Sequence, residues 1–384
     1  MKIELDKDIL ADAVAWAARS LPLRPSFPIL AGLKITAEAD VVTLASFDYE
    51  TSAQVTIKAA VEAPGVALVS GKLLADITRS LPAKPVVITS GESEVELVCG
   101  SARFTLQTLP VEDYPILPAM PRASGWIGSE DLSKAVAQVV VAAGRDELLP
   151  VFTGVRVEFD GENLSLLATD RYRMALKEMT WQPAIEVRET AALVPGKVLA
   201  DTAKSMASAE RVTISLADVS AGEGLIGFEA EGADGVRQIT TRLLDGEFPK
   251  LRHLMNIPGD LTVRANTAEL IAAVRRVSLV AEKNTSLRMN IGEDSVTLEA
   301  AKGDQAAAVE SVGALIDYAG DKPLTEAGFN PHYLLDVLSV LDTTYVHIAF
   351  TGSGKPCLIT ALPDLDGEPA TDYRHVIMLM RLTG

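Results

Sequence analysis

Apolar residues recur along the chain with two different spacings. Leu132, Val136 and Val139 follow the three- and four-residue spacing of one helix face. Segments such as 95–98 and 104–107 alternate apolar with polar residues, as strands with one buried face do, and glycines separate them. The pattern predicts helices among short strands that form antiparallel meanders.

The same elements return in the same order along the chain. Residues 68–81 recur at 193–206, and a weaker third copy covers 329–341. A helix pattern recurs at 10–14, 132–136 and 270–274, and a strand pattern at 42–48, 164–170 and, loosely, 296–301. Several blocks in one order indicate three copies of a unit of about 125 residues.

Helix start signals agree with this division. N-caps are expected before the first helix of each copy at Asp6, at Ser129, and at Asn266 or Thr267. The second helix is expected to open at Ser70, at Pro195 and at Asn330-Pro331. Each copy is then an α+β domain with two helices on one face of an antiparallel sheet. We expect the domains at 1–121, 122–252 and 253–384.

The distribution of charged residues along the chain is more informative about function than the net charge. With 35 basic and 52 acidic residues the net charge is −17, which argues against non-specific nucleic-acid binding unless the cations share one face. Basic residues do gather on the predicted helices and just after them, while strands and hairpins are richer in acids. One interpretation is a basic helical face for a polyanion. The other is ordinary solvated helices whose lysines complement the helix dipole.

Signals for catalysis and for metal binding are missing. The four histidines lack metal-ligand spacing, and the two cysteines, Cys99 and Cys357, read as buried thiols. Residues 352–355 resemble a phosphate loop but lack its first glycine, and no nucleophile elbow occurs. We therefore expect no enzyme and no cofactor. Without a signal peptide or a membrane-spanning apolar stretch, we expect a cytoplasmic protein.

Two further segments combine apolar and charged residues. The first, 168–175, reads as a charged turn leading into a strand, and the second is the apolar end of the chain at 376–382. The end of the chain fits a last strand of the third sheet. It also fits a Met-rich wall of a groove for partner peptides, and the two interpretations are compatible.

Five segments together resemble the bacterial DNA polymerase III beta subunit, the sliding clamp, over the whole chain. They are 23–30, 108–115, 168–175, 328–333 and 378–382. The residues at 111–115 and 142–146 are similar to those of the actinobacterial members of this family. The resemblance implies a head-to-tail homodimeric ring of six similar domains, with the helices lining the hole around duplex DNA. Such a non-catalytic processivity factor would tether the replicative polymerase, clamp loader and repair proteins through short peptide motifs.

The resemblance also implies site residues. Contacts to DNA without sequence preference would come from Arg24, Lys72, Arg79, Arg145, Lys197, Lys283, Asn330 and Tyr333. A loop that contacts DNA in some relatives differs here at 146–151. Dimer contacts would come from Leu81, Phe104, Leu106 and Leu279.

The peptide pocket of the family maps onto the two mixed segments and onto the link between the second and third copies. It comprises Thr169, Arg171, Tyr172, Arg173, Met174, Pro249, Leu254, Met378, Leu379, Met380, Arg381 and Leu382. Many relatives have Gly-His in place of Arg171-Tyr172 and Pro in place of Leu379, so a different peptide preference is expected. The alternatives are a non-ring scaffold that binds peptides through the same repeats, and an enzyme with a cleft between domains.

Overall fold

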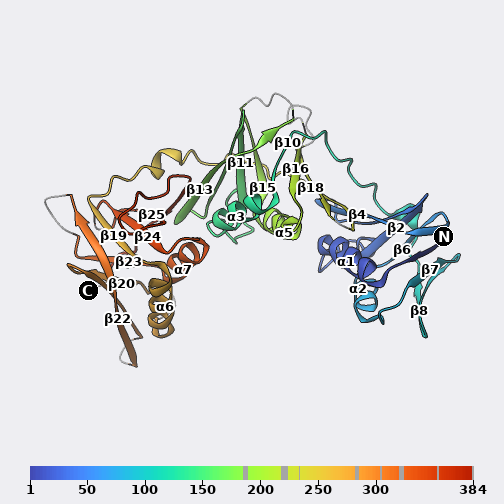
Figure 1. Ribbon diagram of the computed structural model, residues 1–384, viewed down its shortest axis with the longest axis horizontal. Coiled ribbons are helices and arrows are strands. Elements are labelled where there is room, and N and C mark those ends of the chain that lie inside the picture. Colours follow the sequence, from blue (N-terminus) through green and yellow to red (C-terminus); the bar gives the residue numbers. More distant parts are fainter. Residues whose placement is uncertain are drawn as a thin grey trace. The chain divides into compact units, whose positions relative to one another are not determined.

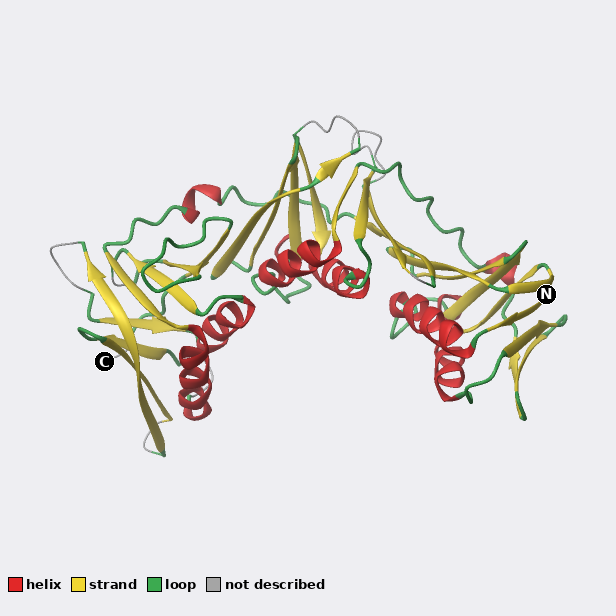
Figure 2. Cartoon of the chain, viewed as in Figure 1, coloured by secondary structure: helices red, strands yellow, loops and turns green. Residues whose placement is uncertain are grey.

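The computed structural model describes residues 1–184, 189–217, 224–232, 234–281, 285–302, 305–319, 324–352 and 354–382. These residues form two compact units built from interleaved chain segments. The first unit draws on 1–133, 181–187 and 198–243, and the second on 134–180, 188–197 and 244–384. Both units combine α-helices with antiparallel strands (Figure 1, Figure 2).

The helices recur in the order that the sequence predicts. The α-helices are α1 (Lys7–Ala17), α2 (Gly71–Ser80), α3 (Ser129–Val140), α4 (Pro150–Thr153), α5 (Gly196–Met206), α6 (Thr267–Val277) and α7 (Pro331–Val340). Short 3-10 helices are η1 (Ala18–Ser20), η2 (Pro28–Ala31), η3 (Val111–Asp113), η5 (Arg252–Met255) and η6 (Ser278–Val280). In the first unit α1 packs on α2, and in the second α6 packs on α7.

Side-chain caps explain several of the helix starts. Asp6 accepts hydrogen bonds from the amides of Asp8 and Ile9 at 2.7 and 3.2 Å, and Asn266 and Asn330 cap α6 and α7 in the same way. The prediction for Ser129 is wrong, because Ser129 is already helical and its hydroxyl donates to a loop carbonyl. Ser70 and Pro195 do precede α2 and α5, but the Ser70 side chain makes no capping hydrogen bond.

The first unit contains two sheets. The smaller has the order β5 (Ala60–Ala63), β1 (Lys2–Leu5), β7 (Val86–Ser90), β8 (Glu94–Cys99) and β9 (Ala102–Gln107). The larger has the order β14 (Gln182–Pro183), β10 (Gly125–Gly128), β16 (Arg211–Leu216), β17 (Leu225–Gly232), β18 (Gly235–Arg242), β4 (Thr51–Lys58), β3 (Val41–Phe47), β2 (Gly32–Glu38) and β6 (Gly65–Ser70). Pairing of β4 with β18 joins strands of the first and second repeats.

The second unit is built on one twelve-stranded sheet. Its order is β15 (Thr190–Pro195), β11 (Gly154–Asp160), β12 (Asn163–Thr169), β13 (Arg173–Thr180), β26 (Tyr373–Ile377), β25 (Cys357–Leu362), β24 (Tyr345–Phe350), β19 (Leu261–Asn266), β22 (Ala306–Tyr318), β21 (Ser295–Lys302), β20 (Leu287–Ile291) and β23 (Glu326–Phe329). Here β13 pairs with β26 and joins the second repeat to the third.

Buried apolar residues occur at equivalent positions in the three repeats. Leu44, Leu166 and Leu298 occupy corresponding strand positions, and each is almost fully buried. Cys99 and Cys357 are buried free thiols, as expected, and burial raises the pKa of Cys357 to about 12. Among the described helices, none is long and apolar enough to cross a membrane.

Candidate functional site

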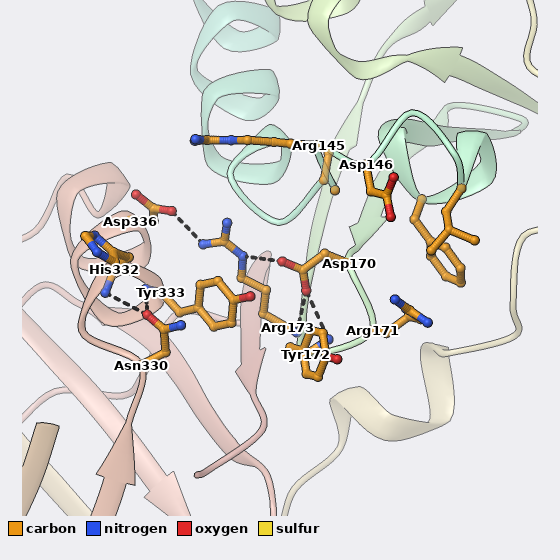
Figure 3. A pocket seen from close by; sticks show the side chains of 14 residues that line it. Arg145, Asp146, Asp170, Arg171, Tyr172, Arg173, Asn330, His332, Tyr333 and Asp336 are labelled. Carbon is orange, nitrogen blue, oxygen red and sulfur yellow. Dashed lines mark hydrogen bonds and ion pairs between the residues drawn. The ribbon is translucent and has the colours of Figure 1, made fainter. Parts of the chain in front are cut away.

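Three segments of the second unit surround a cavity of about 430 Å³. They are the stretch from the end of α3 through α4, the turn between β12 and β13, and the first half of α7 with the residue before it (Figure 3). The side chains that line it are those of Ala143, Arg145, Asp146, Leu149, Phe152, Asp170, Arg171, Tyr172, Arg173, Asn330, His332, Tyr333 and Asp336, together with the backbone at Gly144. Its size falls within the range of small-ligand and peptide side-chain pockets.

The β12–β13 turn is held by its own polar side chains. Asp170 Oδ1 accepts from the backbone amides of Tyr172 and Arg173, each at 3.0 Å. The Thr169 hydroxyl accepts from the Arg171 amide at 3.0 Å and donates to the Arg173 carbonyl at 2.7 Å. These bonds hold Arg171 at φ 80°, in the left-handed region. The turn therefore presents Arg171 and Tyr172 to solvent while Arg173 points inward.

Arg173 is a buried ionic link between two repeats. Its side chain is 5% exposed, and its guanidinium lies 3.0 Å from Asp170 and 2.6 Å from Asp336 of α7. The same group lies 4.2 Å from the centroid of the Tyr333 ring. Burial, with the nearby Asp170 charge, raises the pKa of Tyr333. Arg173 thus supports one wall of the cavity rather than offering a free charge to a ligand.

The structure brings together residues that the sequence assigned to different partners. Asn330 and Tyr333, predicted to contact DNA, line the same cavity as Arg171, Tyr172 and Arg173, predicted to bind peptides (Figure 3). Arg145, also a DNA prediction, lies at the edge of this cavity. Phe152 and Asp336 line it as well, and the sequence did not single them out for a site.

Other members of the predicted peptide pocket lie away from this cavity. Met174 is buried in an apolar cluster with Phe248, Met255 and Val376. Pro249 lines a depression of about 540 Å³, and Met380 and Arg381 line another of about 450 Å³. Partly or fully exposed positions are those of Leu254, Met378, Leu379 and Leu382. The predicted single groove is therefore divided among separate surfaces.

The end of the chain is held by backbone hydrogen bonds to the β12–β13 turn and to β23. β26 ends at Ile377, so the strand interpretation of the terminus is confirmed for 376–377, while 378–382 lie beyond the strand. Beyond it, the Met378 amide donates to the Tyr172 carbonyl and the Met380 amide to the Gly328 carbonyl, each at 2.8 Å. Backbone bonds hold the Met-rich segment, and the Met378 side chain stays 38% exposed.

The predicted DNA residues that stay outside the cavity are solvated cations. Arg24 is exposed in the loop after η1, Lys72 and Arg79 on α2, and Lys197 on α5. Arg79 lies 3.7 Å from Asp76, one turn earlier on the same helix. Lys283 lies outside the residues that the structure describes.

The four predicted dimer residues divide into two pairs. Leu81 and Leu106 are buried within the first unit, whereas Phe104 on β9 is partly exposed. Leu279 in η6 is 83% exposed. Only Phe104 and Leu279 therefore have surface free for another molecule.

Two further groups of charged or titratable residues in the second unit escaped the sequence analysis. The Tyr373 hydroxyl donates to the Gln138 carbonyl and also lies within hydrogen-bond distance of His375 Nδ1, each contact at 3.0 Å. Burial, with the Arg173 charge nearby, lowers the pKa of His375 to about 3. Tyr373 and His375 lie two residues apart on β26, but the contact with Gln138 of α3 joins residues 235 positions apart, and no local pattern in the sequence marks it.

The second group is a chain of ion pairs on the sheet surface. Arg252 of η5 lies 2.7 Å from Glu158 and 2.5 Å from Glu178, and Glu178 also pairs with Arg374. Burial opposes ionisation of Glu158, but hydrogen bonds from Arg156 and Arg252 outweigh it and lower the pKa of that carboxyl. These ion pairs hold η5, which carries Arg252, against the sheet.

The fold defines a class of α+β protein with three repeated two-helix domains, and the comparisons identify the family. Residues 1–118, 127–250 and 258–381 match the N-terminal, central and C-terminal domains of the DNA polymerase III beta subunit. The chain belongs to this family, the bacterial beta sliding clamps.

Individual relatives agree. The chain is 48% identical to the "Beta sliding clamp" of Streptomyces coelicolor over 384 residues, which is all of both chains. It is 48% identical to that of Micrococcus luteus over 317 residues, covering 83% of this chain and all of that one. The sliding clamp structure from Bacillus subtilis matches with a TM-score of 0.88 at 26% identity, with both chains fully covered.

The resemblance inferred from the sequence is thus confirmed, as are the three clamp domains. The chain is a DNA polymerase III processivity factor of a non-catalytic family. Its identity as a beta clamp implies DNA and polymerase as partners.

Proposed function

We propose that two copies of the chain form a head-to-tail ring that encircles duplex DNA and tethers polymerase, clamp loader and repair proteins by short peptides. The observation that carries this proposal is a repeated edge pairing. The first two repeats are joined through β4 and β18, and the last two through β13 and β26. In the third repeat, residues 306–313 of β22 pair only with β21, and in the first repeat β9 pairs only with β8. Among the described strands, these two stretches therefore keep an unpaired side where the other repeats have their junction.

The sheet registers predict how these two edges would meet. The equivalent leucines Leu44, Leu166 and Leu298 pair across strands with Val55, Lys177 and Glu310, respectively. Val55, Lys177 and Glu310 are therefore at equivalent positions of the three repeats. A second set of corresponding residues starts from the buried Ile88, Ile214 and Ile348. Following the cross-strand pairs over the next two strands leads to Phe104, Ile239 and His375, respectively, so these three residues also correspond. Ile239 pairs with Ala53, and His375 with Ala175. Because Ala308 corresponds to these alanines, it should face Phe104 of a second copy, and Ala307 should face Thr105.

Side chains at these edges support the same seam. Phe104 takes the place of Ile239 and His375, which are both buried at their junctions. Its own ring is partly exposed, and Val309 on β22 is 66% exposed. The exposed Leu279 follows α6, which packs on β22. A second copy would remove these apolar surfaces from water, and each repeat would then have the same edge contacts.

Engineered disulfides test the register. An Ala307→Cys, Thr105→Cys variant should form a disulfide between copies, and Ala307→Cys with Arg103→Cys, two residues out of register, should form much less. The native thiols are buried and do not interfere. Light scattering should give about twice the chain mass of 40.8 kDa. A monomer would favour the non-ring scaffold instead.

Exposed cations support a loose contact with DNA. The acidic chain carries Arg24, Lys72, Arg79, Arg145 and Lys197 at exposed positions on helices or in the loops that follow them. Phosphate contacts of this kind lack sequence preference, which suits sliding. Lys283 is proposed from the sequence alone. The test is retention on nicked circular DNA, with loss when the circle is linearised.

The cavity of the second unit is proposed as a partner-peptide site. Thr169, Arg171, Tyr172 and Arg173 form or shape one wall, and Asn330 and Tyr333 belong to this site rather than to a DNA surface. The apolar surface at Pro249, Leu254 and residues 378–382 would accept flanking parts of a partner. We further propose action in the cytoplasm, with domains at 1–121, 122–252 and 253–384.

A further inference from the structure

The cavity contains arginines in two different electrostatic states. Arg173 is neutralised by Asp170 and Asp336. For Arg171 and Arg145, no ion pair is found within the described part of the chain. The third carboxylate, Asp146, accepts from the Leu148 amide of its own loop at 3.0 Å. Asp146 keeps further acceptor positions, so the charged donors left at the rim are those of the two guanidinium groups.

Aromatic rings hold Arg171 in place. Its guanidinium carbon lies 5.5 Å from the centroid of the Phe152 ring and 5.9 Å from that of Tyr172. Contacts of this kind at exposed sites contribute about 0.5–1 kcal/mol each. They leave the edge of the guanidinium, with its N–H donors, open to a ligand. Figure 3 shows Arg171 and Arg145 on opposite sides of the Asp170–Arg173 pair, so each offers a separate anchor.

The equivalent turn of the first repeat shows that the fold does not require an arginine here. There Tyr49 has φ 75° where Arg171 has φ 80°. Asp48 accepts from the amides of Glu50 and Thr51 at 2.9 and 2.7 Å, as Asp170 does from the two residues after Arg171. The aspartate sets the turn in both repeats, and a tyrosine suffices at this position in the first repeat. The positive charge of Arg171 is thus unexplained by folding.

We propose that Arg171 selects partner peptides that carry an aspartate or glutamate beside their apolar anchors. A guanidinium donates two parallel hydrogen bonds to a carboxylate, which is a strong and directional contact. Three aspartates line the same cavity, so a single carboxylate is accommodated there more readily than a DNA backbone with its row of phosphates. This inference rests on the proposed peptide function of the cavity and specifies the chemistry of its partners.

The test uses a matched pair of synthetic peptides of about eight residues, with leucine and phenylalanine as apolar anchors. One carries aspartate next to the anchors and the other asparagine at the same position. Calorimetric titration at low salt should show at least about fivefold tighter binding of the aspartate peptide, and the preference should shrink at high salt. Arg171→Gln and Arg171→Tyr should reduce the preference below about twofold, and Arg171→Lys should retain part of it.

Tyr49→Gln, at the equivalent turn of the first repeat, is the matched control and should keep the wild-type preference. Equal binding of the two peptides to wild type, or an unchanged preference in Arg171→Gln, would overturn the inference and leave the peptide site intact. A parallel loss of both peptides in Arg171→Gln would also overturn it, since support of Phe152 would then explain Arg171. Loss of retention on circular DNA with an intact peptide preference would assign Arg171 to DNA. Failure of wild type to bind either peptide would instead contradict the proposed function.

Discussion

The β4–β18 and β13–β26 junctions share one backbone design and differ in the chemistry of their side chains. Neutral groups meet across the first, where the hydroxyls of Ser52 and Thr240 lie 2.6 Å apart. Across the second, the position of Ser52 is taken by Met174 and that of Thr240 by Val376. Both belong to one buried apolar cluster. Backbone pairing thus preserves the repeat, while the side chains are free to build a site.

Charge separates the two junctions further. At the first, Arg237 pairs with Asp12 and lies over the Trp16 ring. The second combines the buried Arg173 pairs with those of Lys177 and Arg374. Buried ion pairs depend on both partners and on pH more than neutral hydroxyl pairs do. The junction beside the proposed peptide site should therefore be the more sensitive one.

The largest expected effect is that of Arg173→Met. It leaves Asp170 and Asp336 without their partner, and we expect the second unit to lose about 3 kcal/mol of stability. Arg237→Met is the control at the first junction, where Asp12 is more exposed, with an expected loss of about 1 kcal/mol. Urea unfolding followed by circular dichroism measures both. Equal losses would remove the distinction between the junctions.

Acid should weaken the second junction selectively. The pKa of His375 is depressed to about 3, so the unfolded chain binds this proton first, and stability falls as pH drops from about 6.5 toward 3. The lowered pKa of Glu158 adds a loss below about 4.3, the ordinary value for glutamate. We expect a decrease of about 2 kcal/mol between pH 7 and pH 4.5.

The chain offers a built-in reporter for this comparison. Trp16, Trp126 and Trp181, its three tryptophans, all belong to the first unit. At pH 4.5, loss of circular dichroism should therefore precede the change in tryptophan fluorescence during urea unfolding. Coincident transitions at both pH values would contradict the prediction. A folded His375→Gln variant should show a flatter dependence on pH.

A smaller effect is expected from Ser52→Ala. The change leaves the buried Thr240 hydroxyl without its partner and should cost about 1 kcal/mol, independent of pH. Tryptophan fluorescence during urea unfolding reads it directly. Thr297→Ala removes an exposed hydroxyl pair with Ser311 and serves as the control. It lies in the second unit, so circular dichroism follows it, and the change should stay within about 0.5 kcal/mol. A pH-dependent loss in Ser52→Ala would show that a titrating group acts on this hydroxyl pair.

The smallest effect is expected from Arg252→Gln, because Arg252 is partly exposed and its ion pairs are screened by salt. We expect a loss below about 1 kcal/mol that disappears at high salt. The pKa of Glu158 should rise toward its ordinary value, which carboxyl NMR titration measures. An unchanged pKa would mean that Arg156 alone stabilises that carboxylate.

Much of the architecture could be predicted from the sequence because it depends on local pattern. Repeated blocks, helical spacing and caps such as Asp6 and Asn330 indicated three α+β copies, and five motifs indicated the family. Ser129 was misassigned because its hydroxyl is taken by a loop 80 residues away. The candidate site was predicted as residue types with divided roles. Their grouping around one cavity depends on contacts between β12–β13 and α7.

The sequence by itself determined the elements, the repeat and the family, since hydrophobic period and capping act over a few residues. Only the tertiary structure decided which charges are free. Arg171 and Arg173 are two residues apart and look alike in the sequence, yet one is stacked on rings at the surface and the other is buried between two carboxylates. The difference arises because successive side chains of a tight turn point in different directions, and because Asp336 reaches Arg173 from a helix 163 residues later.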